Sequence, residues 1–398
     1  MRNVLIVGAG VAGPTLAYWL ARAGFQLTVV ERAQGQRSSG NPVDVRGPAL
    51  PVAEAMGVIP ALREAATTVT AMRLIDSRGR RRGRLPMPAG RSAAGTEEIE
   101  VPRADLATIL YEAARDHAEF LFDDTVTGFS QDPDGVDVTF ERSAPRRFGL
   151  VVGADGLHST VRRLAFGPEE QFVRHLGVYV ATLPLGEPVD HPDEALMYNT
   201  PGRLISVHPS RDHALLAFIF RGAAIPGFDH RDVALHKRVL LQAYANDRNW
   251  LVPEYLERVR SAEDLYFDSV SKVVLPSWTN GRVTLLGDAA ASVSLFGDGS
   301  SMAMAGAQTL ANALSEAGAE SESGGRGCGE SDSNVNSDGD LATALKRYEA
   351  EHRRRTDPKG RNARFSAAMI VPSTRSGIAL RNAAARIAIR GEKQAALR

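Results

Sequence analysis

The first 31 residues constrain the fold of this chain most, because they combine a strand, a glycine-rich turn, a helix and a second strand. Residues 4–7 form a short apolar run, which is typical of a parallel strand buried on both faces. Apolar residues between 16 and 21 recur at helical spacing, and Gly24 follows them as a helix stop. Residues 27–30 form a second apolar run that ends at Glu31. The pattern predicts a βαβ unit.

A GxGxxG motif joins the first of these strands to the helix. Gly8 permits a tight turn, Gly10 lets the backbone approach a pyrophosphate, and Gly13 lets the helix and the strand pack closely. The start of the helix also presents free N–H groups to an anion. Glu31 lies where a carboxylate accepts hydrogen bonds from ribose hydroxyls, and its charge opposes a 2′-phosphate. The unit therefore predicts binding of FAD or NAD rather than NADP.

Two further glycine motifs decide between these two dinucleotides. Residues 153–158 read GADGLH after an apolar strand at 150–152, and continue STVR. Residues 287–299 read GDAAASVSLFGDG after a strand at 283–286 and before a helix. A carboxylate at a strand end can bond a sugar-like polyol, and a glycine-rich helix start offers N–H groups to a carbonyl-rich ring. The three motifs together favour FAD.

In this order and spacing, the motifs resemble those of the class A flavoprotein aromatic hydroxylases, the family of para-hydroxybenzoate hydroxylase and the tetracycline-inactivating monooxygenases. The resemblance covers most of the chain. It implies an α/β fold, in which a Rossmann-like FAD-binding domain of the GR2 type interlocks with an antiparallel-sheet substrate domain and is followed by a C-terminal helical segment. It also implies hydroxylation of an electron-rich aromatic molecule, phenolic or polyketide-like, with NAD(P)H and O2 through a flavin C4a-hydroperoxide. There is no second GxGxxG for NAD(P)H, which agrees with a family in which the nicotinamide binds transiently.

The resemblance also implies which residues contact the cofactor. Glu31 binds the adenosine ribose, Asp155 supports both FAD and the passing nicotinamide, and Asp288 binds the ribitol chain. Arg103, in VPRADL, matches a family arginine near the flavin, and Arg46, in VDVRG, matches a loop near the flavin but could equally be a surface loop arginine. The full expected set is Gly8, Gly10, Gly13, Glu31, Arg32, Arg46, Arg103, Asp155, Gly156, Gly287, Asp288, Gly297, Gly299 and Ser300.

The third motif departs from the family pattern. Ala291 and Leu295 stand where the family usually has His or Tyr and a proline, and the loop between Asp288 and Gly297 is one residue shorter than usual. We expect FAD binding to persist and oxygen activation to be less well protected. Two alternatives therefore stay open: an FAD-dependent reductase or dehydrogenase of the same fold that does not activate oxygen, and a non-catalytic flavin-binding protein.

No residue is assigned as the catalytic base. His208, His213, Tyr179 and Tyr198 lie on the block expected to form the substrate domain, and each is also a common structural strand residue. No metal-ligand spacing is present in the sequence, so no metal is expected.

Segments with the pattern of an antiparallel sheet alternate along the chain with the segments of the FAD-binding domain. Residues 72–85 suggest an antiparallel hairpin, and three alternating strands occur between 176 and 270. Residues 317–340 are rich in Ser, Gly, Asp and Glu, and predict a disordered acidic insertion. The expected domains are an FAD-binding domain (1–71, 97–175 and 271–343), a substrate-binding sheet domain (72–96 and 176–270) and a C-terminal helical segment (344–398).

The composition of the chain argues against nucleic acid and membranes as binding partners. The chain has 47 basic and 47 acidic residues, so no overall charge attracts it to nucleic acid or to a membrane. The basic segment 344–398 is expected to be a solvated helical face that closes over the nucleotide domain. Cys328 is the single cysteine, which excludes an intrachain disulfide, and no signal peptide or spanning segment is expected. We expect a cytoplasmic protein, a monomer or homodimer, whose partner is a small aromatic substrate.

Overall fold

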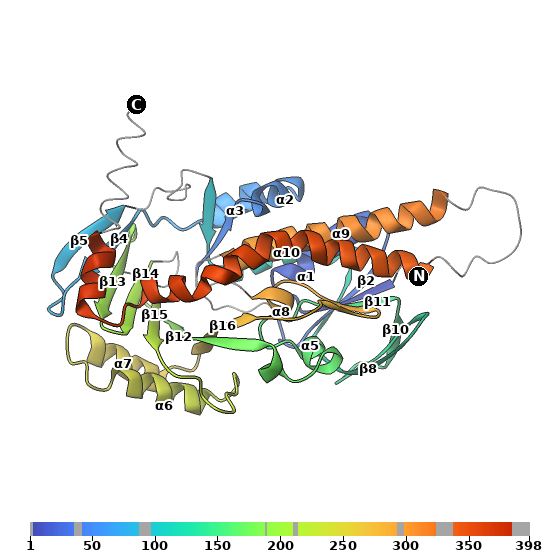
Figure 1. The fold of residues 1–398 in the computed structure, drawn as a ribbon. Helices are drawn as coiled ribbons and strands as arrows, with labels where there is room; N and C mark the ends of the chain where they lie inside the picture. Colours follow the sequence, from blue (N-terminus) through green and yellow to red (C-terminus); the bar gives the residue numbers. More distant parts are fainter. Residues whose placement is uncertain are drawn as a thin grey trace, which may run out of the picture.

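The computed structural model describes residues 3–35, 42–86, 97–187, 189–209, 214–292, 298–323 and 337–383. Two sheets dominate the fold, and the long helix α10 (Ser337–Ile370) runs from one to the other (Figure 1). None of the helices in the described ranges has the length and apolarity needed to cross a bilayer. The expected α/β fold class is confirmed.

The first sheet has six strands and contains the βαβ unit expected at the N-terminus. Its strand order is β17 (Thr279–Asn280), β18 (Val283–Leu285), β11 (Leu150–Gly153), β1 (Asn3–Val7), β2 (Gln26–Glu31) and β7 (Glu119–Phe122). All neighbours pair in parallel except β17 and β18. The three glycine motifs follow β1, β11 and β18, which are adjacent, so all three lie at the same edge of the sheet, which we call the motif edge.

Helices and two small sheets cover this first sheet. The buried strand residues of β1 are apolar on both faces because helices lie on each side. The helices are α1 (Ala12–Arg22), α2 (Ala49–Ala55), α3 (Ile59–Ala65), α4 (Arg103–Ala114), α5 (Thr160–Ala165), α8 (Asp288–Ala291) and α9 (Asp298–Ser323), with short 3-10 turns at Arg115–His117 and Glu169–Gln171. The small sheets are β10 (Arg146–Phe148), β9 (Gly135–Phe140) and β8 (Val126–Asp132), and the pair β3 (Val43–Arg46) and β6 (Glu98–Val101).

The second sheet has seven strands. Its order is β16 (Tyr266–Val273), β12 (Val173–Pro184), β15 (Leu215–Arg221), β14 (Arg203–His208), β13 (Glu194–Thr200), β4 (Ala71–Ile75) and β5 (Arg81–Pro86). The hairpin expected at 72–85 is present as β4 and β5, and it extends the sheet through a parallel pairing with β13. The strands β12 and β16 reach slightly beyond the expected boundaries at 176 and 270.

The two faces of this second sheet have different neighbours. Side chains alternate between the faces along each strand. One face, which includes Tyr179 and Phe218, packs on α6 (Val233–Tyr244) and α7 (Val252–Ser261). We call the opposite face, which includes Val180 and Thr182, the inner face. It contacts α10 at Ala367 and faces the first sheet's domain.

The insertion expected at 317–340 is helical at both ends, which corrects the prediction there. α9 continues to Ser323 and α10 begins at Ser337, while residues 324–336, including Cys328, lie outside the described ranges. The extension needs no apolar side chains, because lengthening a helix that already exists adds a backbone hydrogen bond for each residue fixed. Figure 1 shows α9 and α10 side by side.

Helix α10 is anchored by buried side chains. Tyr348 is fully buried and its hydroxyl donates to the Leu285 carbonyl oxygen at 3.0 Å. His352 is also buried, against Gly306 of α9 and stacked with Tyr348. The helix therefore closes over the first sheet's domain through these buried side chains.

Candidate functional site

Two of the glycines in the first motif are required by close backbone contacts. Gly8 has a φ of +108°, and a Cβ there would lie 2.6 Å from the carbonyl oxygen of Ala154 in the second motif. A Cβ on Gly13 would lie only 1.9 Å from the Gly8 carbonyl oxygen. These contacts bring β1, α1 and the end of β11 together as the motif predicts.

Gly10 has a different environment. A Cβ on this residue would meet no atom within 4 Å, so the backbone here borders open space. The adjoining helix α1 has no side-chain cap at its start, which leaves its first N–H groups available. A space that lacks a Cβ, beside an uncapped helix N-terminus, fits a dinucleotide pyrophosphate.

Glu31 is held beside this loop. The Ala9 N–H donates to its Oε2 and the Ala33 N–H to its Oε1, each at 2.9 Å. The carboxylate is thereby fixed at the end of β2, where each oxygen retains a second lone pair for a ribose hydroxyl. The next residue, Arg32, points to the second domain, where its Nη1 lies 3.3 Å from His230 Nε2.

In the second motif, Asp155 is largely occupied by its own turn. It accepts hydrogen bonds from the Ser159 hydroxyl at 2.5 Å and the Val161 N–H at 3.1 Å, at the start of α5. Burial raises the pKa of this carboxyl. Gly156 has a φ of +81° and no atom near its Cβ position, so it borders open space as Gly10 does.

The third motif meets the first directly. Gly287 has a φ of +64°, and its Cβ position lies 3.2 Å from the Ala12 Cβ of α1. Asp288 is the first residue of α8, and within the described ranges its carboxylate has no hydrogen-bond donor. Burial raises the pKa of Asp288, the positive charge of Arg103 lowers it, and the charge of Asp268 raises it. A half-buried carboxylate without a donor fits the hydroxyls of a ribitol chain.

The two arginines expected near the flavin, Arg103 and Arg46, differ in their exposure and in their ion pairs. Arg103 is an exposed residue at the start of α4, and its charge acts on Asp288. Arg46 is engaged with Asp298 at 2.9 Å and with Glu98 at 3.1 Å. In this structure its guanidinium fastens β3 to the start of α9.

Gly299 and Ser300 lie in the first turn of α9. The Ser300 hydroxyl donates to the Asp44 carbonyl oxygen at 3.1 Å, which also ties α9 to β3. Gly297 and Leu295 lie outside the described residues. Ala291 ends α8.

A charged cluster links the second motif to the second domain, and no role was assigned to it from the sequence. His158 Nδ1 lies 2.9 Å from Glu169 and its Nε2 lies 3.1 Å from Asp268 of β16. Burial alone would lower the pKa of His158, but the hydrogen bonds to Asp268 and Glu169 raise it to about 9. The fully buried Arg162 donates to Glu169 and to the Ala289 carbonyl oxygen. His158 and Arg162 belong to the quoted GADGLHSTVR stretch, whereas Asp268 and Glu169 carry no sequence signal.

His158 also carries a stacked ring. His230, from the segment between β15 and α6, lies parallel to it with 4.1 Å between ring centroids. Burial, followed by the charges of His158 and Arg32, lowers the pKa of His230 to about 4. The neutral ring of His230 therefore covers a protonated His158.

Two candidate bases point away from the motif edge. The Tyr179 hydroxyl donates to the Ala223 carbonyl oxygen at 2.9 Å, and the Tyr198 hydroxyl lies 3.3 Å from Asp247. Both belong to the apolar cluster under α6 and α7. Burial and the charge of Asp247 raise the pKa of Tyr198 to about 12. Neither tyrosine lies on the inner face.

His208 does lie on the inner face. It is the register partner of Leu215, two residues from the inner-face position Ala217. Its Nε2 lies 3.6 Å from Glu100 of β6, and its Nδ1 lies 3.0 Å from the Pro209 carbonyl oxygen. His213, the fourth candidate, lies outside the described residues.

The rest of the inner face is mostly apolar. Neighbouring register partners share a face, which groups side chains from β12, β15, β14, β13 and β4. Thr182 is fully buried there, and its hydroxyl has no hydrogen-bond partner among the described residues. The half-buried apolar members are Met72, Val180, Met197, Leu215 and Ile219. The arrangement offers a broad apolar wall with few polar groups.

The fold and the motif edge together define a flavoprotein. A family model described as "FAD binding domain" matches residues 1–325, which is most of the chain. This protein belongs to that FAD-binding family.

Similarity to known proteins shows which kind of flavoprotein this chain is. A protein of Mycobacterium tuberculosis is 40% identical over 325 residues, covering 80% of this chain and 86% of the relative, and carries no assigned activity. A flavin-dependent monooxygenase from an unknown prokaryotic organism is 34% identical and covers 79% of this chain and 82% of the relative. The crystal structure of the tetracycline destructase Tet(51) has a TM-score of 0.81 and 27% identity, and covers 98% of this chain and 96% of that chain. The chain is an FAD-dependent monooxygenase of class A, as the motifs predicted.

Proposed function

We propose that this monooxygenase hydroxylates an electron-rich aromatic molecule of phenolic or polyketide type, with NAD(P)H and O2 as co-substrates. The observation that carries this proposal is the half-buried apolar wall of the inner face, which includes Met197 and Ile219. The same face carries His208, which lies 3.6 Å from Glu100 of β6, in the domain that bears the three motifs. A wall of this kind suits a planar ring system better than a charged substrate. The similarity to a tetracycline destructase supports a polyketide-like substrate.

The residues at the motif edge fit FAD. We propose that Gly10 and the start of α1 bind the pyrophosphate, that Glu31 binds the adenosine ribose and that Asp288 binds the ribitol chain. When bound, FAD supplies hydride acceptance from NAD(P)H and oxygen activation. Arg103, whose charge already acts on Asp288, adds a positive charge on the same side.

A phenolic substrate becomes more nucleophilic when it loses its proton, which requires an acceptor near the ring. We propose His208 for this role, because it is on the inner face and Glu100 lies 3.6 Å from its Nε2. The Glu100 carboxylate stabilises the imidazolium that forms when a proton arrives. Burial alone would raise the pKa of Glu100, but its hydrogen bond to His208 and the charge of a protonated His208 lower it.

A second candidate function is a flavin-dependent reductase that does not activate oxygen. Ala291, which ends α8 where the family usually has His or Tyr, favours this alternative. The discriminating observation is whether an oxygen atom enters the product.

The experiment measures NADH or NADPH oxidation, O2 uptake and product mass in parallel, against a panel of phenols and aromatic polyketides. We expect O2 uptake together with a product that has gained one oxygen atom. Flavin reduction without any oxygenated product across the panel would support the reductase instead. A bound flavin that neither nucleotide reduces would support a non-catalytic flavin protein.

The assignment of His208 has its own test. The His208→Asn variant should keep FAD and the rate of flavin reduction, and should lose most of its hydroxylation rate below the pKa of the substrate phenol. Addition of a substrate that is already ionised should restore the rate. A variant that hydroxylates the neutral phenol as fast as the native protein would refute the role of His208.

A further inference from the structure

The two-stranded ribbon of β3 and β6 carries an excess of acidic side chains next to the start of α9. Asp44 lies opposite Glu100 in the antiparallel pairing, and Arg46 lies opposite Glu98. Because side chains alternate along a strand, these four lie on one face of the ribbon, which we call the acidic face. All four are half-buried or less exposed, so water screens their charges poorly.

Arg46 joins the acidic face to α9. Its Nη1 lies 3.4 Å from Asp44 Oδ2 and 3.1 Å from Glu98 Oε1. Its Nη2 lies 2.9 Å from Asp298 Oδ1, and Lys359 of α10 lies 2.8 Å from the other oxygen of Asp298. One guanidinium therefore serves two carboxyls of the ribbon and one of the helix.

The third carboxyl of the acidic face, Glu100, has partners on its other side. The Thr67 hydroxyl donates to its Oε2 at 2.5 Å, and His208 of β14 lies 3.6 Å from its Oε1. Arg46 is thus left to Asp44 and Glu98 among the carboxyls of the ribbon.

Asp44 and Glu98 are hydrogen-bonded to each other through their side chains. Two ionised carboxylates have only acceptor atoms, so this hydrogen bond requires a proton on one of them. Burial, followed by the charge and the hydrogen bond of Glu98, raises the pKa of Asp44 to about 8, although the charge of Arg46 opposes the shift. The pair therefore holds one proton at neutral pH.

The backbone of β3 is also bonded to the first turn of α9. The hydroxyls of Ser300 and Ser301 donate to the Asp44 carbonyl oxygen at 3.1 Å and 2.7 Å. The Arg46 N–H donates to Ser301 Oγ at 3.1 Å. A displacement of β3 therefore displaces this turn, which also carries Gly299, one of the expected flavin contacts.

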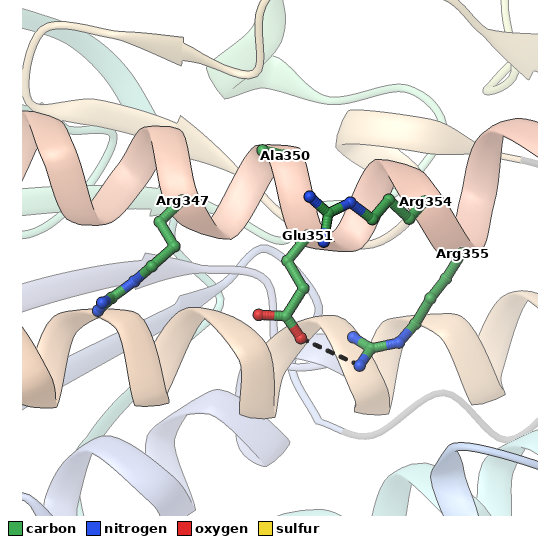
Figure 2. A pocket seen from close by; sticks show the side chains of 5 residues that line it. All are labelled: Arg347, Ala350, Glu351, Arg354 and Arg355. Carbon is green, nitrogen blue, oxygen red and sulfur yellow. Dashed lines mark hydrogen bonds and ion pairs between the residues drawn. The ribbon is translucent and has the colours of Figure 1, made fainter.

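The rest of α9 is held independently of β3. Figure 2 shows Arg347 and Arg355 extending from α10 toward the neighbouring helix, α9. Arg347 pairs with Glu316 at 2.8 Å, and Arg355 donates to the Thr309 hydroxyl at 2.8 Å. These contacts lie about five and about three turns beyond the start of α9. Only the first turn of the helix depends on the ribbon.

From this arrangement we propose that Asp44 is a positioning residue, whose proton, shared with Glu98, keeps β3 beside β6 and the first turn of α9 in place for the flavin. Loss of this proton leaves two carboxylates that repel each other in a half-buried space. The strand β3 then shifts from β6 and takes Ser300 and Ser301 with it. The effect on the flavin rests on the proposed FAD site, whereas the shared proton does not.

The first test compares native apoprotein with Asp44→Asn, which keeps the shape of a protonated carboxyl and cannot ionise. The folded protein retains the Asp44 proton up to about pH 8, whereas the unfolded chain releases it near 3.8. The stability due to this group is therefore complete below 3.8 and is lost as the pH rises through 8. Relative to Asp44→Asn, the unfolding equilibrium constant of the native protein should rise about tenfold per pH unit between about pH 5 and pH 8, and then level off.

Urea titration of the apoproteins across this pH range measures the effect. Glu316→Gln, at an exposed carboxylate of α9, is the matched control, and its unfolding constant should keep a fixed ratio to the native value. Glu98→Gln removes the partner of Asp44 and should abolish part of the same pH dependence. Parallel stability curves for Asp44→Asn and the native protein overturn the shared proton.

The second test is fluorescence titration with FAD at about pH 7 and about pH 9. The Kd of the native protein should rise about three- to tenfold between the two, as is typical of the loss of one hydrogen bond. Asp44→Asn should bind FAD equally well at both. A merely structural role for Asp44 predicts the same ratio of variant to native Kd at both pH values, and that result overturns the positioning role.

This proposal and the proposed function fail separately, because neither test uses turnover. The absence of an oxygenated product from every compound of the panel would overturn the proposed function and leave the stability and FAD comparisons as they are. Normal hydroxylation with parallel stability curves would overturn only the role of Asp44.

Discussion

Substitution of alanine at two glycines of the first motif separates the demands of the fold from those of the cofactor. In Gly13→Ala, the new Cβ would lie 1.9 Å from the Gly8 carbonyl oxygen, although real Cβ contacts essentially never fall below 3.0 Å. Helix α1 and the Gly8 turn must therefore separate by roughly 1 Å, and overpacking of this kind costs about 1–3 kcal/mol. We expect the apoprotein itself to lose this amount of stability and to melt several degrees earlier.

Gly10→Ala is the matched control. Its Cβ meets no atom within 4 Å and its φ lies outside the left-handed region, so the apoprotein should be unchanged or more stable by about 0.4–1 kcal/mol. The added methyl nevertheless occupies the space assigned to the pyrophosphate, and FAD affinity should fall by tenfold or more.

Differential scanning calorimetry of both apoproteins and fluorescence titration with FAD measure the two effects. Native FAD affinity in Gly10→Ala would refute the placement of the pyrophosphate. An apoprotein of Gly13→Ala with native stability would refute the packing argument.

Three further predictions concern other parts of the molecule. The pKa of His158 is about 9 in the folded state against 6.5 unfolded, so its stabilisation of about 3 kcal/mol is complete below pH 6.5 and is lost as the pH rises through 9. The melting temperature of His158→Gln should therefore vary less between these pH values than that of the native protein, and parallel curves would contradict the argument. Tyr348→Phe removes the buried hydrogen bond to the Leu285 carbonyl oxygen and should lower the free energy of unfolding by about 1 kcal/mol, measured by urea titration. An unchanged midpoint of urea unfolding would show that this bond contributes nothing to stability. Part of the NAD(P)H that the native protein consumes should appear as hydrogen peroxide. Leu295→Pro should lower that fraction in a peroxide assay, because it restores the family's proline beside the flavin. A native protein that forms no peroxide would show that its loop already excludes water.

The sequence was sufficient for the parts of the site that depend on local chain geometry. A buried strand followed by glycine and a helix has few alternatives, so Gly8 and Gly13 could be assigned to the turn and to the close packing that the structure contains. The hairpin of β4 and β5 was likewise readable from the alternating pattern of residues 72–85. The strand β13 and helix α7 were missed, although Val252, Tyr255, Leu256 and Val259 of α7 recur at helical spacing.

Other assignments depended on contacts that no local pattern carries. Alternation along β12 and β13 shows that side chains point to two faces, but it does not say which face meets the other domain. Tyr179 and Tyr198 therefore remained candidate bases until the packing of α6 and α7 placed them on the far side. Arg46 and Ser300 also bind β3 to α9 across about 250 residues of sequence, a role that no local pattern indicated.

The sequence alone thus determined the class of cofactor, because three glycine turns and two carboxylates at strand ends are local features with a single geometry. Tertiary structure alone decided the surroundings of that edge. The pairing of His158 with Asp268, 110 residues apart, arises where segments distant in sequence pack together. Such contacts depend on how whole sheets and helices are oriented, and the residues involved show no spacing from which that orientation can be read.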